Sequence, residues 1–263
     1  MLLITGGTGF IGKNLVPSLL EEYDVRLLTR DPVDAKRLFP KAEIYKGDIT
    51  KKDSLRKALK DIDSVVHLAG IVSYSLPREE LFRINFKGTK NLLEYCTKID
   101  KFIFSSSVSV YGETRTKATE NYRCRPANPY GESKLKAEKA VLQSRIPSVV
   151  FRIAPIYGVG SPSWLKNLKL LERGFPIPRT KNLTHIIHIT DVVQAFELGL
   201  KKGEGVYNIA DKEPVRFTEF AEMLVRALGK RPVKMPAWFV NLLAAASGKK
   251  TYCLLYTSPS PRD

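Results

Sequence analysis

A tyrosine and a lysine, Tyr130 and Lys134, stand four residues apart in the segment NPYGESKLKAEKAV. On a helix this spacing places both side chains on one face. A tyrosine with its ordinary pKa near 10 is a poor base at neutral pH, but a neighbouring ammonium and a second nearby cation would favour the phenolate. Such a pair could move a proton while a bound redox cofactor moves a hydride. Because the spacing alone is common by chance, it needs support from other segments.

A serine cluster in FIFSSSVSVYG supplies part of that support. The serines end an apolar run at 101–106 that predicts a buried strand. Open α/β sheets bind their ligands at the carboxyl ends of the strands. A serine hydroxyl there could contact the oxygen of a substrate next to the tyrosine.

A glycine-rich turn, TGGTGFIG at residues 5–12, directly follows the apolar start of the chain. Gly6 permits a tight turn, Gly9 a close approach of the backbone to a ligand, and Gly12 close packing of the following helix. Thr8 would help to satisfy the exposed N–H groups. Since free N–H groups at a helix start bind anions, the turn predicts a pyrophosphate and therefore a dinucleotide.

Strand-like and helix-like segments alternate along the chain and must position these groups. Strands are expected at 1–5, 24–29, 42–46, 63–68, 101–106 and 148–153, and helices at 10–22, 33–39, 51–60, 78–98 and 130–145. This alternation predicts an α/β fold, a Rossmann-type doubly wound parallel sheet with helices on both faces.

The ends of the second, third and fourth strands would meet the rest of the dinucleotide. Thr29 stands where NAD-binding proteins carry an acidic residue, and the arginine that follows, Arg30, suits a 2′-phosphate. NADP is therefore favoured over NAD, although Asp31 would restore an acidic partner if the register were one residue off. Asp48 could accept a hydrogen bond from the adenine amino group or cap the following segment. The small residues of HLAG end the fourth strand, and His67 is interpreted as a packed strand residue rather than a base.

Together these segments resemble the extended short-chain dehydrogenase/reductase superfamily, the NAD-dependent epimerase/dehydratase group. The matching pieces are TGGTGFIG, GDIT, HLAG, NFKGTKNLL, SSSVSVYG, YGESK, RIAPIYG and HITDV, in the family order over about residues 1–230. The resemblance implies a catalytic set in which Ser107 supplies the hydroxyl, with Ser106 as the neighbour if the register is off. Tyr130 would be the acid/base, and Lys134 would hold the ribose and lower the tyrosine pKa.

By the same resemblance, Asn85 would keep the fourth helix and the proton route in order, unless it is a plain helix-surface residue. Arg152 and His188 match family positions near the second domain without an assigned chemistry. The residues expected to contact the cofactor are Gly6, Thr8, Gly9, Phe10, Ile11, Gly12, Arg30, Asp48, Ile49, Leu68, Ala69, Gly70, Tyr130, Lys134, Pro155 and Ile156. No metal is expected.

Three activities fit the resemblance. We favour a reductase or dehydrogenase that transfers a hydride between the nicotinamide and a carbonyl or alcohol, because VRLLTRDP resembles NADP-binding dihydroflavonol-reductase-like members and KMPAWFVNLLAAASG also resembles 3β-hydroxysteroid-dehydrogenase-like ones. A UDP-sugar epimerase is the alternative, because FIFSSSVSVYG resembles 4-epimerases. A non-catalytic sensor or assembly subunit is the third. Val108 and Ser109 replace the acidic pair of sugar 4,6-dehydratases, which argues against that reaction.

Composition limits the partners. The formal net charge is +16, but the basic residues are mixed with acidic ones and no aromatic-interleaved basic motif is present, so a solvated surface or attraction of a phosphorylated ligand is favoured over nucleic acid. No signal peptide and no membrane-spanning run are expected, and Cys96, Cys124 and Cys253 form no metal or redox pair. We expect a cytoplasmic protein with reduced thiols, a small-molecule substrate and a possible homodimer.

The second part of the chain has a weaker pattern. We expect a dinucleotide-binding domain at 1–160 with returning segments at about 184–212, and a substrate-binding part at 161–183 and 213–252. Within the latter, PAWFVNLLAAAS could be a core helix, a dimer contact or a membrane-facing surface, with core as the default. Residues 253–263, CLLYTSPSPRD, resemble adapter-derived sequence and are expected to be a non-native tail on a truncated chain.

Overall fold

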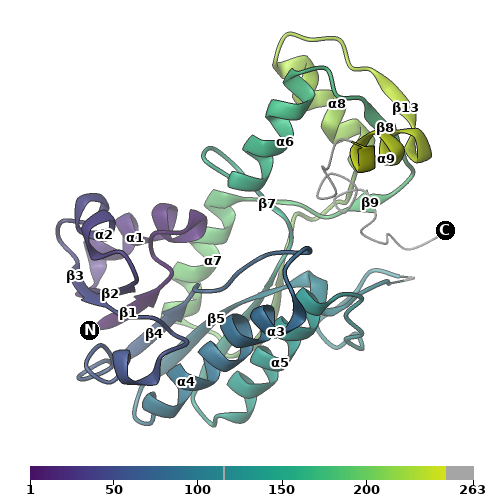
Figure 1. The fold of residues 1–263 in the computed structure, drawn as a ribbon. Helices are drawn as coiled ribbons and strands as arrows, with labels where there is room; N and C mark the ends of the chain where they lie inside the picture. The colour runs from purple at the N-terminus through teal and green to yellow at the C-terminus, as the bar shows by residue number, and fades with distance from the viewer. Residues whose placement is uncertain (115, 247–263) are drawn as a thin grey trace.

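The computed structural model describes residues 1–114 and 116–246, so the expected tail at 253–263 and residues 247–252 lie outside the described residues. Seven parallel strands form the central sheet (Figure 1), and its order confirms the predicted Rossmann-type fold. Across the sheet the strands are β3 (Glu43–Lys46), β2 (Val25–Thr29), β1 (Leu2–Thr5), β4 (Ser64–His67), β5 (Lys101–Ser107), β6 (Ser148–Ile153) and β11 (Gly205–Ile209).

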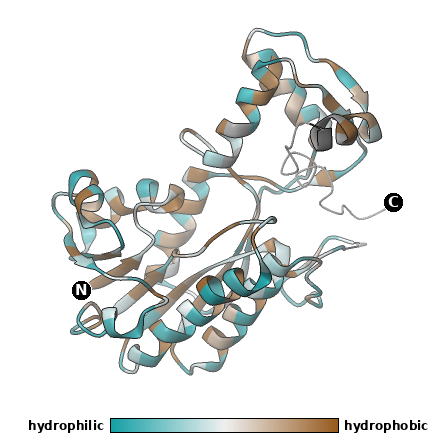
Figure 2. Cartoon of the chain, viewed as in Figure 1, coloured by the Kyte–Doolittle hydropathy of each residue, from teal (hydrophilic) through white to brown (hydrophobic). Residues whose placement is uncertain are grey.

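Helices cover both faces of this sheet. One layer contains α1 (Phe10–Glu22), α2 (Pro32–Leu38) and α7 (Ile189–Lys201), and the other contains α3 (Arg78–Leu81), α4 (Gly88–Tyr95) and α5 (Pro129–Gln143). Successive strand residues serve opposite layers: Leu2 and Ile4 belong to the core beneath α1, while Leu3 belongs to the core beneath α4 and α5. Figure 2 shows the matching concentration of hydrophobic residues along the central strands.

The segment at 51–60 differs from the helix expected there. It contains a short 3₁₀ helix, η1 (Lys52–Ser54), followed by turns. The apolar residues Leu55, Ala58 and Leu59 have the spacing of a helix, and all three are buried. The carbonyls of Ala58 and Lys60, however, accept hydrogen bonds from the Arg26 side chain of β2, at 3.1 and 2.6 Å. Hydrogen bonds with the Arg26 side chain therefore take the place of a regular helix.

The expected helix at 78–98 is divided into three parts. α3 is followed by a π-helical segment, η2 (Phe82–Lys87), before α4, which ends at Tyr95. A π segment widens one turn and often occurs at a functional site. Here it contains Asn85, whose side chain is buried.

The chain after β6 builds a smaller unit beside the sheet (Figure 1). Its elements are β7 (Ile156–Tyr157), α6 (Pro162–Glu172), β8 (Ile177–Arg179), β9 (Leu183–Thr184), β10 (Ile187–His188), β12 (Val215–Arg216), α8 (Phe217–Ala227), β13 (Lys234–Pro236) and α9 (Ala237–Ala246). A separate apolar cluster joins α6, α8 and α9. In α9, Val240 is buried in this cluster while Trp238 and Leu242 are largely exposed, so the helix is only partly the core element that was expected.

The glycine turn brings β1, β4 and α1 together without side chains between them. Gly6 has a left-handed φ of 75°, and a Cβ there would lie 2.6 Å from the Ala69 nitrogen at the end of β4. A Cβ at Gly12 would lie 2.3 Å from the carbonyl oxygen of Gly7. Since both obstacles are backbone atoms, neither can move aside as a flexible side chain would.

We expect Gly12→Ala to lower the free energy of unfolding by about 1–3 kcal/mol, because the added methyl group overpacks a backbone contact. Urea denaturation measures this change. Lys13→Ala is the control, since Lys13 is exposed in the same helical turn. Equal stability of the two variants would contradict the proposed packing.

Candidate active site

The first turn of α5 brings the expected catalytic tyrosine to the end of β5. Asn128 caps this helix by accepting a hydrogen bond from the Gly131 nitrogen at 2.9 Å, and Pro129 occupies the first helical position. A Cβ at Gly131 would lie 2.4 Å from the carbonyl oxygen of Ser109. This close contact, which sequence reasoning missed, places Tyr130 beside the residues that follow β5.

The two serines at the end of β5 have different surroundings. Ser107 is the one that acts to lower the pKa of Tyr130, whereas the Ser106 hydroxyl donates to Glu138 at 2.8 Å. The Ser106 hydroxyl is therefore committed to Glu138, and Ser107 stays the predicted hydroxyl donor.

Tyr130 is buried, with its ring 5.9 Å from the ring of Tyr74 in an edge-to-face contact. Burial raises the pKa of its phenol above the ordinary value, and the hydrogen bond with Ser107 acts in the opposite direction. Desolvation therefore outweighs the hydrogen bond at this phenol.

Lys134 lies one turn further along α5 and is also buried. Its Nζ stands 4.3 Å from the centre of the Phe104 ring, a cation–π contact. Burial lowers its pKa to about 7, while the charge of Glu138 acts to raise it. The amine is therefore close to its titration point near neutral pH.

Asn85 joins three segments around this lysine. Its Nδ2 donates to the Ile71 carbonyl and to Ser133 Oγ, both at 3.0 Å, and its Oδ1 accepts from the Ile71 nitrogen at 2.8 Å. Ser133, also missed by sequence reasoning, donates in turn to the Tyr130 carbonyl at 2.7 Å. A Cβ at Gly70 would lie 3.1 Å from Asn85 Oδ1 and 3.9 Å from Lys134 Nζ. Asn85 is thus a buried residue that links Ile71 and Ser133 by hydrogen bonds, and not a helix-surface residue.

The start of α1 offers backbone that could cradle an anion. Its cap residue, Gly9, is exposed, a Cβ there would meet only the Gly6 carbonyl within 4 Å, and the first turn contains no acidic residue. Within the described chain no side chain caps this helix, so Thr8 does not provide the expected capping bond. Phe10, Ile11 and Gly12 form the first turn, whose N–H groups fit a pyrophosphate.

Around the expected adenosine end, two acidic residues have local partners. Asp31 caps α2 by accepting from the nitrogens of Val33 and Asp34, at 3.1 and 3.0 Å. Asp48 Oδ1 accepts from the nitrogen and hydroxyl of Thr50, at 2.8 and 2.9 Å.

The Asp48 pKa is lowered: burial acts to raise it, but the Thr50 hydrogen bonds and the charges of Arg30 and Arg83 lower it. Arg30 itself is exposed just beyond β2, and Ile49 is buried beside Asp48. A guanidinium therefore faces this end of the sheet, while the Asp31 carboxylate is occupied as a cap.

The remaining expected contacts lie on neighbouring segments of the same strand ends. Leu68 and Ala69 follow β4, and their nitrogens contact the carbonyl and hydroxyl oxygens of Thr5 at 3.0 and 3.3 Å. Pro155 and Ile156 follow β6, and their carbonyls accept from the Ile187 nitrogen and the Trp164 indole.

Comparison with known proteins agrees with this geometry. The family model described as NAD dependent epimerase/dehydratase family matches residues 2–210. The chain belongs to this family. It is accordingly an enzyme of the NAD-dependent dehydrogenase or epimerase type. Among the curated proteins, the chain is similar to the decarboxylating sterol-4-alpha-carboxylate 3-dehydrogenase of Mus musculus, with 29% identity over 92% of this chain and 73% of that protein.

Solved structures show the same fold. The UDP-glucose 4-epimerase of Thermus thermophilus, in complex with NAD, has a TM-score of 0.78 and 26% identity over 89% of this chain and 85% of its own. The UDP-glucuronic acid 4-epimerase of Bacillus cereus, also with NAD, has a TM-score of 0.78 and 27% identity over 89% and 87%.

The described residues contain no group of His, Cys, Asp or Glu side chains that could hold a metal ion. Among the same residues, no helix has the length and apolar character needed to cross a membrane.

His67, interpreted from sequence as a packed residue, is fully buried between two threonines. Its Nδ1 lies 2.6 Å from Thr5 Oγ1 and its Nε2 lies 2.9 Å from Thr89 Oγ1. Burial, together with the charge of Lys134, lowers its pKa to about 3.

We expect the free energy of unfolding to decrease as pH falls below about 6.5. In the unfolded chain His67 binds a proton near that pH, whereas in the folded chain it stays neutral down to about pH 3. At about 1.4 kcal/mol per pKa unit, the loss between pH 7 and pH 4 is about 3 kcal/mol. His67→Gln removes this contribution, so denaturation curves should depend less on pH. His188→Gln, which replaces a partly exposed imidazole, is the control. An unchanged pH dependence in His67→Gln would refute the assignment.

Proposed function

We propose that this enzyme is an NAD(P)-dependent dehydrogenase that interconverts a secondary alcohol and a ketone. The observation that carries the proposal is the placement of buried Tyr130 beside the end of β5, where the close contact of Gly131 with Ser109 brings α5 next to Ser107, with Lys134 one turn away on the same helix. In this arrangement the serine hydroxyl can orient the substrate oxygen while the phenol exchanges its proton.

The dinucleotide would lie along the strand ends from α1 to β6. The first turn of α1 would hold the pyrophosphate, Lys134 would bind the ribose beside the nicotinamide, and the nicotinamide, when bound, supplies or accepts the hydride. The open glycine backbone fits this ligand. The residues proposed to contact it are Gly6, Thr8, Gly9, Phe10, Ile11, Gly12, Arg30, Asp48, Ile49, Leu68, Ala69, Gly70, Tyr130, Lys134, Pro155 and Ile156.

Proton transfer depends on the buried environment of Tyr130. The protonated phenol is stable there, so it can donate to a ketone oxygen in the reductive direction. In the oxidative direction the phenolate is needed, and an ammonium at Lys134 would stabilise it. Asn85 and Ser133 fix the helix and the Gly70 segment around these groups.

Similarity to the sterol-4-alpha-carboxylate 3-dehydrogenase supports a substrate with a ring hydroxyl, recognised by the described parts of 161–183 and 213–252. UDP-sugar epimerisation is the second candidate, favoured by the fold shared with two 4-epimerases.

Incubation with NADP⁺ or NAD⁺ and a sterol 3-alcohol, and separately with UDP-glucose, distinguishes the two candidate functions. Net reduction of the dinucleotide supports the dehydrogenase, whereas sugar interconversion without net reduction supports the epimerase. Dinucleotide binding with neither outcome would leave a sensor.

We expect Tyr130→Phe to lower kcat by about 10²–10⁴-fold, because the phenyl ring keeps the packing and removes the proton donor. Steady-state kinetics measures this loss, with whichever of the two candidate substrates the wild-type enzyme turns over. Tyr207→Phe is the matched control, since Tyr207 lies on β11 with its hydroxyl on the neighbouring Glu204. Full activity of Tyr130→Phe would disprove the assigned role.

NADP rather than NAD is proposed as the preferred dinucleotide. Arg30 is exposed beyond β2, and the Asp31 carboxylate is occupied in capping α2. Arg30→Ala should therefore weaken NADPH binding by about 10-fold or more, with little effect on NADH. Fluorescence titration measures both affinities, and Arg37→Ala, at an exposed position of α2, serves as control. A wild-type enzyme that prefers NADH would overturn this proposal.

A further inference from the structure

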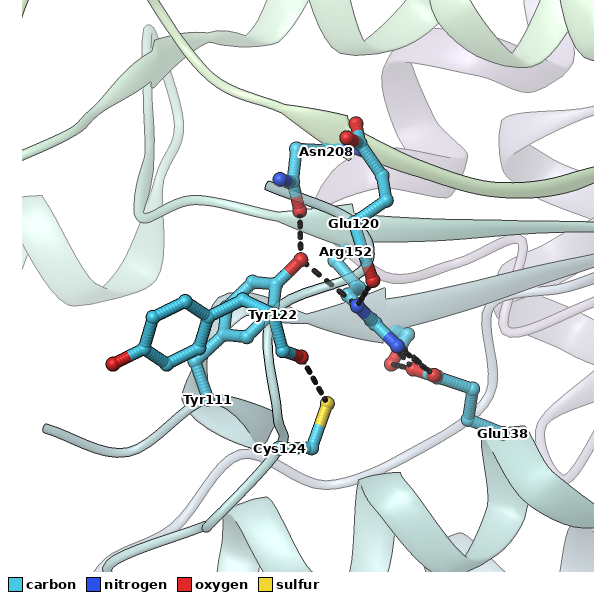
Figure 3. Close-up of polar contacts among 8 residues, drawn as sticks. Tyr111, Glu120, Tyr122, Cys124, Glu138, Arg152 and Asn208 are labelled. Carbon is cyan, nitrogen blue, oxygen red and sulfur yellow. Dashed lines mark hydrogen bonds and ion pairs between the residues drawn. The ribbon is translucent and has the colours of Figure 1, made fainter. Parts of the chain in front are cut away.

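A buried ion pair joins helix α5 to strand β6. Glu138 and Arg152 are 1% and 6% exposed, and Arg152 Nη2 lies 2.5 Å from Glu138 Oε1 while its Nε lies 3.2 Å from both carboxylate oxygens (Figure 3). Charges so deeply buried persist only with good geometry and complete hydrogen bonding. No buried side-chain nitrogen or oxygen in the described chain lacks a partner.

The carboxylate also contacts the strand that carries the catalytic serine. Ser106 donates to Glu138 Oε2 at 2.8 Å, and Ser107 is the next residue along β5. Glu138 therefore links α5 directly to the two strands on which the candidate site depends, β5 and β6.

Arg152 is fixed from the opposite side by groups outside α5. Its Nη1 donates to the Tyr111 hydroxyl and to the Glu120 carbonyl, both at 2.8 Å, and the Tyr111 hydroxyl donates to Asn208 Oδ1 at 2.6 Å (Figure 3). The guanidinium is thereby held by the segment after β5 and by the loop before α5, and the Tyr111 hydroxyl continues the hydrogen bonds to β11. Because it is held in this way, the position of the Glu138 carboxylate is fixed as well.

Lys134 precedes Glu138 by one helical turn, so the two buried side chains share a face of α5. The other groups around the lysine are the Phe104 ring of β5, His67 from β4 and Asn85 from the π segment. Arg78 of α3 is paired with Glu132 on α5. Burial lowers the Lys134 pKa, and the charge of Glu138 is what raises it.

We propose that Glu138 is the positioning residue of this site: its carboxylate, fixed by Arg152 and Ser106, holds α5 against β5 and places a negative charge one helical turn from the Lys134 amine, where it favours the charged form. The catalytic significance of the ammonium rests on the proposed function. The electrostatic relation between Glu138 and Lys134 can be measured without substrate or dinucleotide.

The test is an NMR titration of the full chain labelled with ¹⁵N-lysine, in which Lys134→Met assigns the Lys134 Nζ signal. We expect Glu138→Gln to lower the titration midpoint of Lys134 by about 1 pH unit or more, since the amide keeps the hydrogen-bonding shape and removes the charge. Glu132→Gln is the matched control, because Glu132 lies on the same helix but in a half-exposed pair with Arg78. The Lys134 midpoint in Glu132→Gln should equal that in the wild type.

A second variant guards against misfolding, since Glu138→Gln leaves Arg152 buried without its partner. The double variant Glu138→Gln/Arg152→Met removes both charges, and the proposal requires its Lys134 midpoint to fall as well, by less than in Glu138→Gln, because loss of the Arg152 charge acts in the opposite direction. A midpoint equal to the wild type in the double variant, or an equal fall in Glu132→Gln, overturns the proposal and leaves the pair a purely structural link. Failure of the chain to bind any dinucleotide would instead refute the proposed function and would not alter these midpoints.

Discussion

The site depends on main-chain contacts that exclude side chains at the carboxyl edge of the sheet. At Gly6 the turn after β1 touches the backbone after β4, and at Gly131 the first turn of α5 touches the segment after β5. These contacts align three strand ends and two helix starts within one surface. A methyl group at either position would separate segments that must act together, whatever the other side chains are.

Much of the fold followed from the sequence because parallel strands buried on both faces give continuous apolar runs. The strand at 148–153 was predicted with its observed bounds. The prediction of a helix at 51–60 was wrong because spacing reports burial, not backbone hydrogen bonding, and Leu55, Ala58 and Leu59 can be buried without a regular helix. The π segment around Asn85 was equally hidden, since one widened turn hardly changes an apolar pattern.

The site was predictable only where residues act through local spacing. Tyr130 and Lys134 share a helix, so their separation in sequence determines their proximity. Ser106 and Ser107 could not be distinguished, because that choice depends on Glu138, which is 32 residues away from Ser106. The four-residue spacing between Lys134 and Glu138 is visible in the sequence. The role of Glu138 could not be predicted from it, because that role depends on the ion pair with Arg152 of β6.

Both ends of the loop before α5 are held to one another. Gly112, with a left-handed φ of 70°, lies so close to Arg125 that a Cβ would stand 1.9 Å from its carbonyl oxygen, and the Arg125 nitrogen donates to the Tyr111 carbonyl at 3.2 Å. Closing a longer loop between fixed ends costs little additional entropy. Extra residues could therefore be inserted at little entropic cost, provided that Glu120, whose carbonyl accepts from Arg152 at 2.8 Å, keeps its place. Variation in the length of this loop is thereby confined to the part that makes no contact with the sheet.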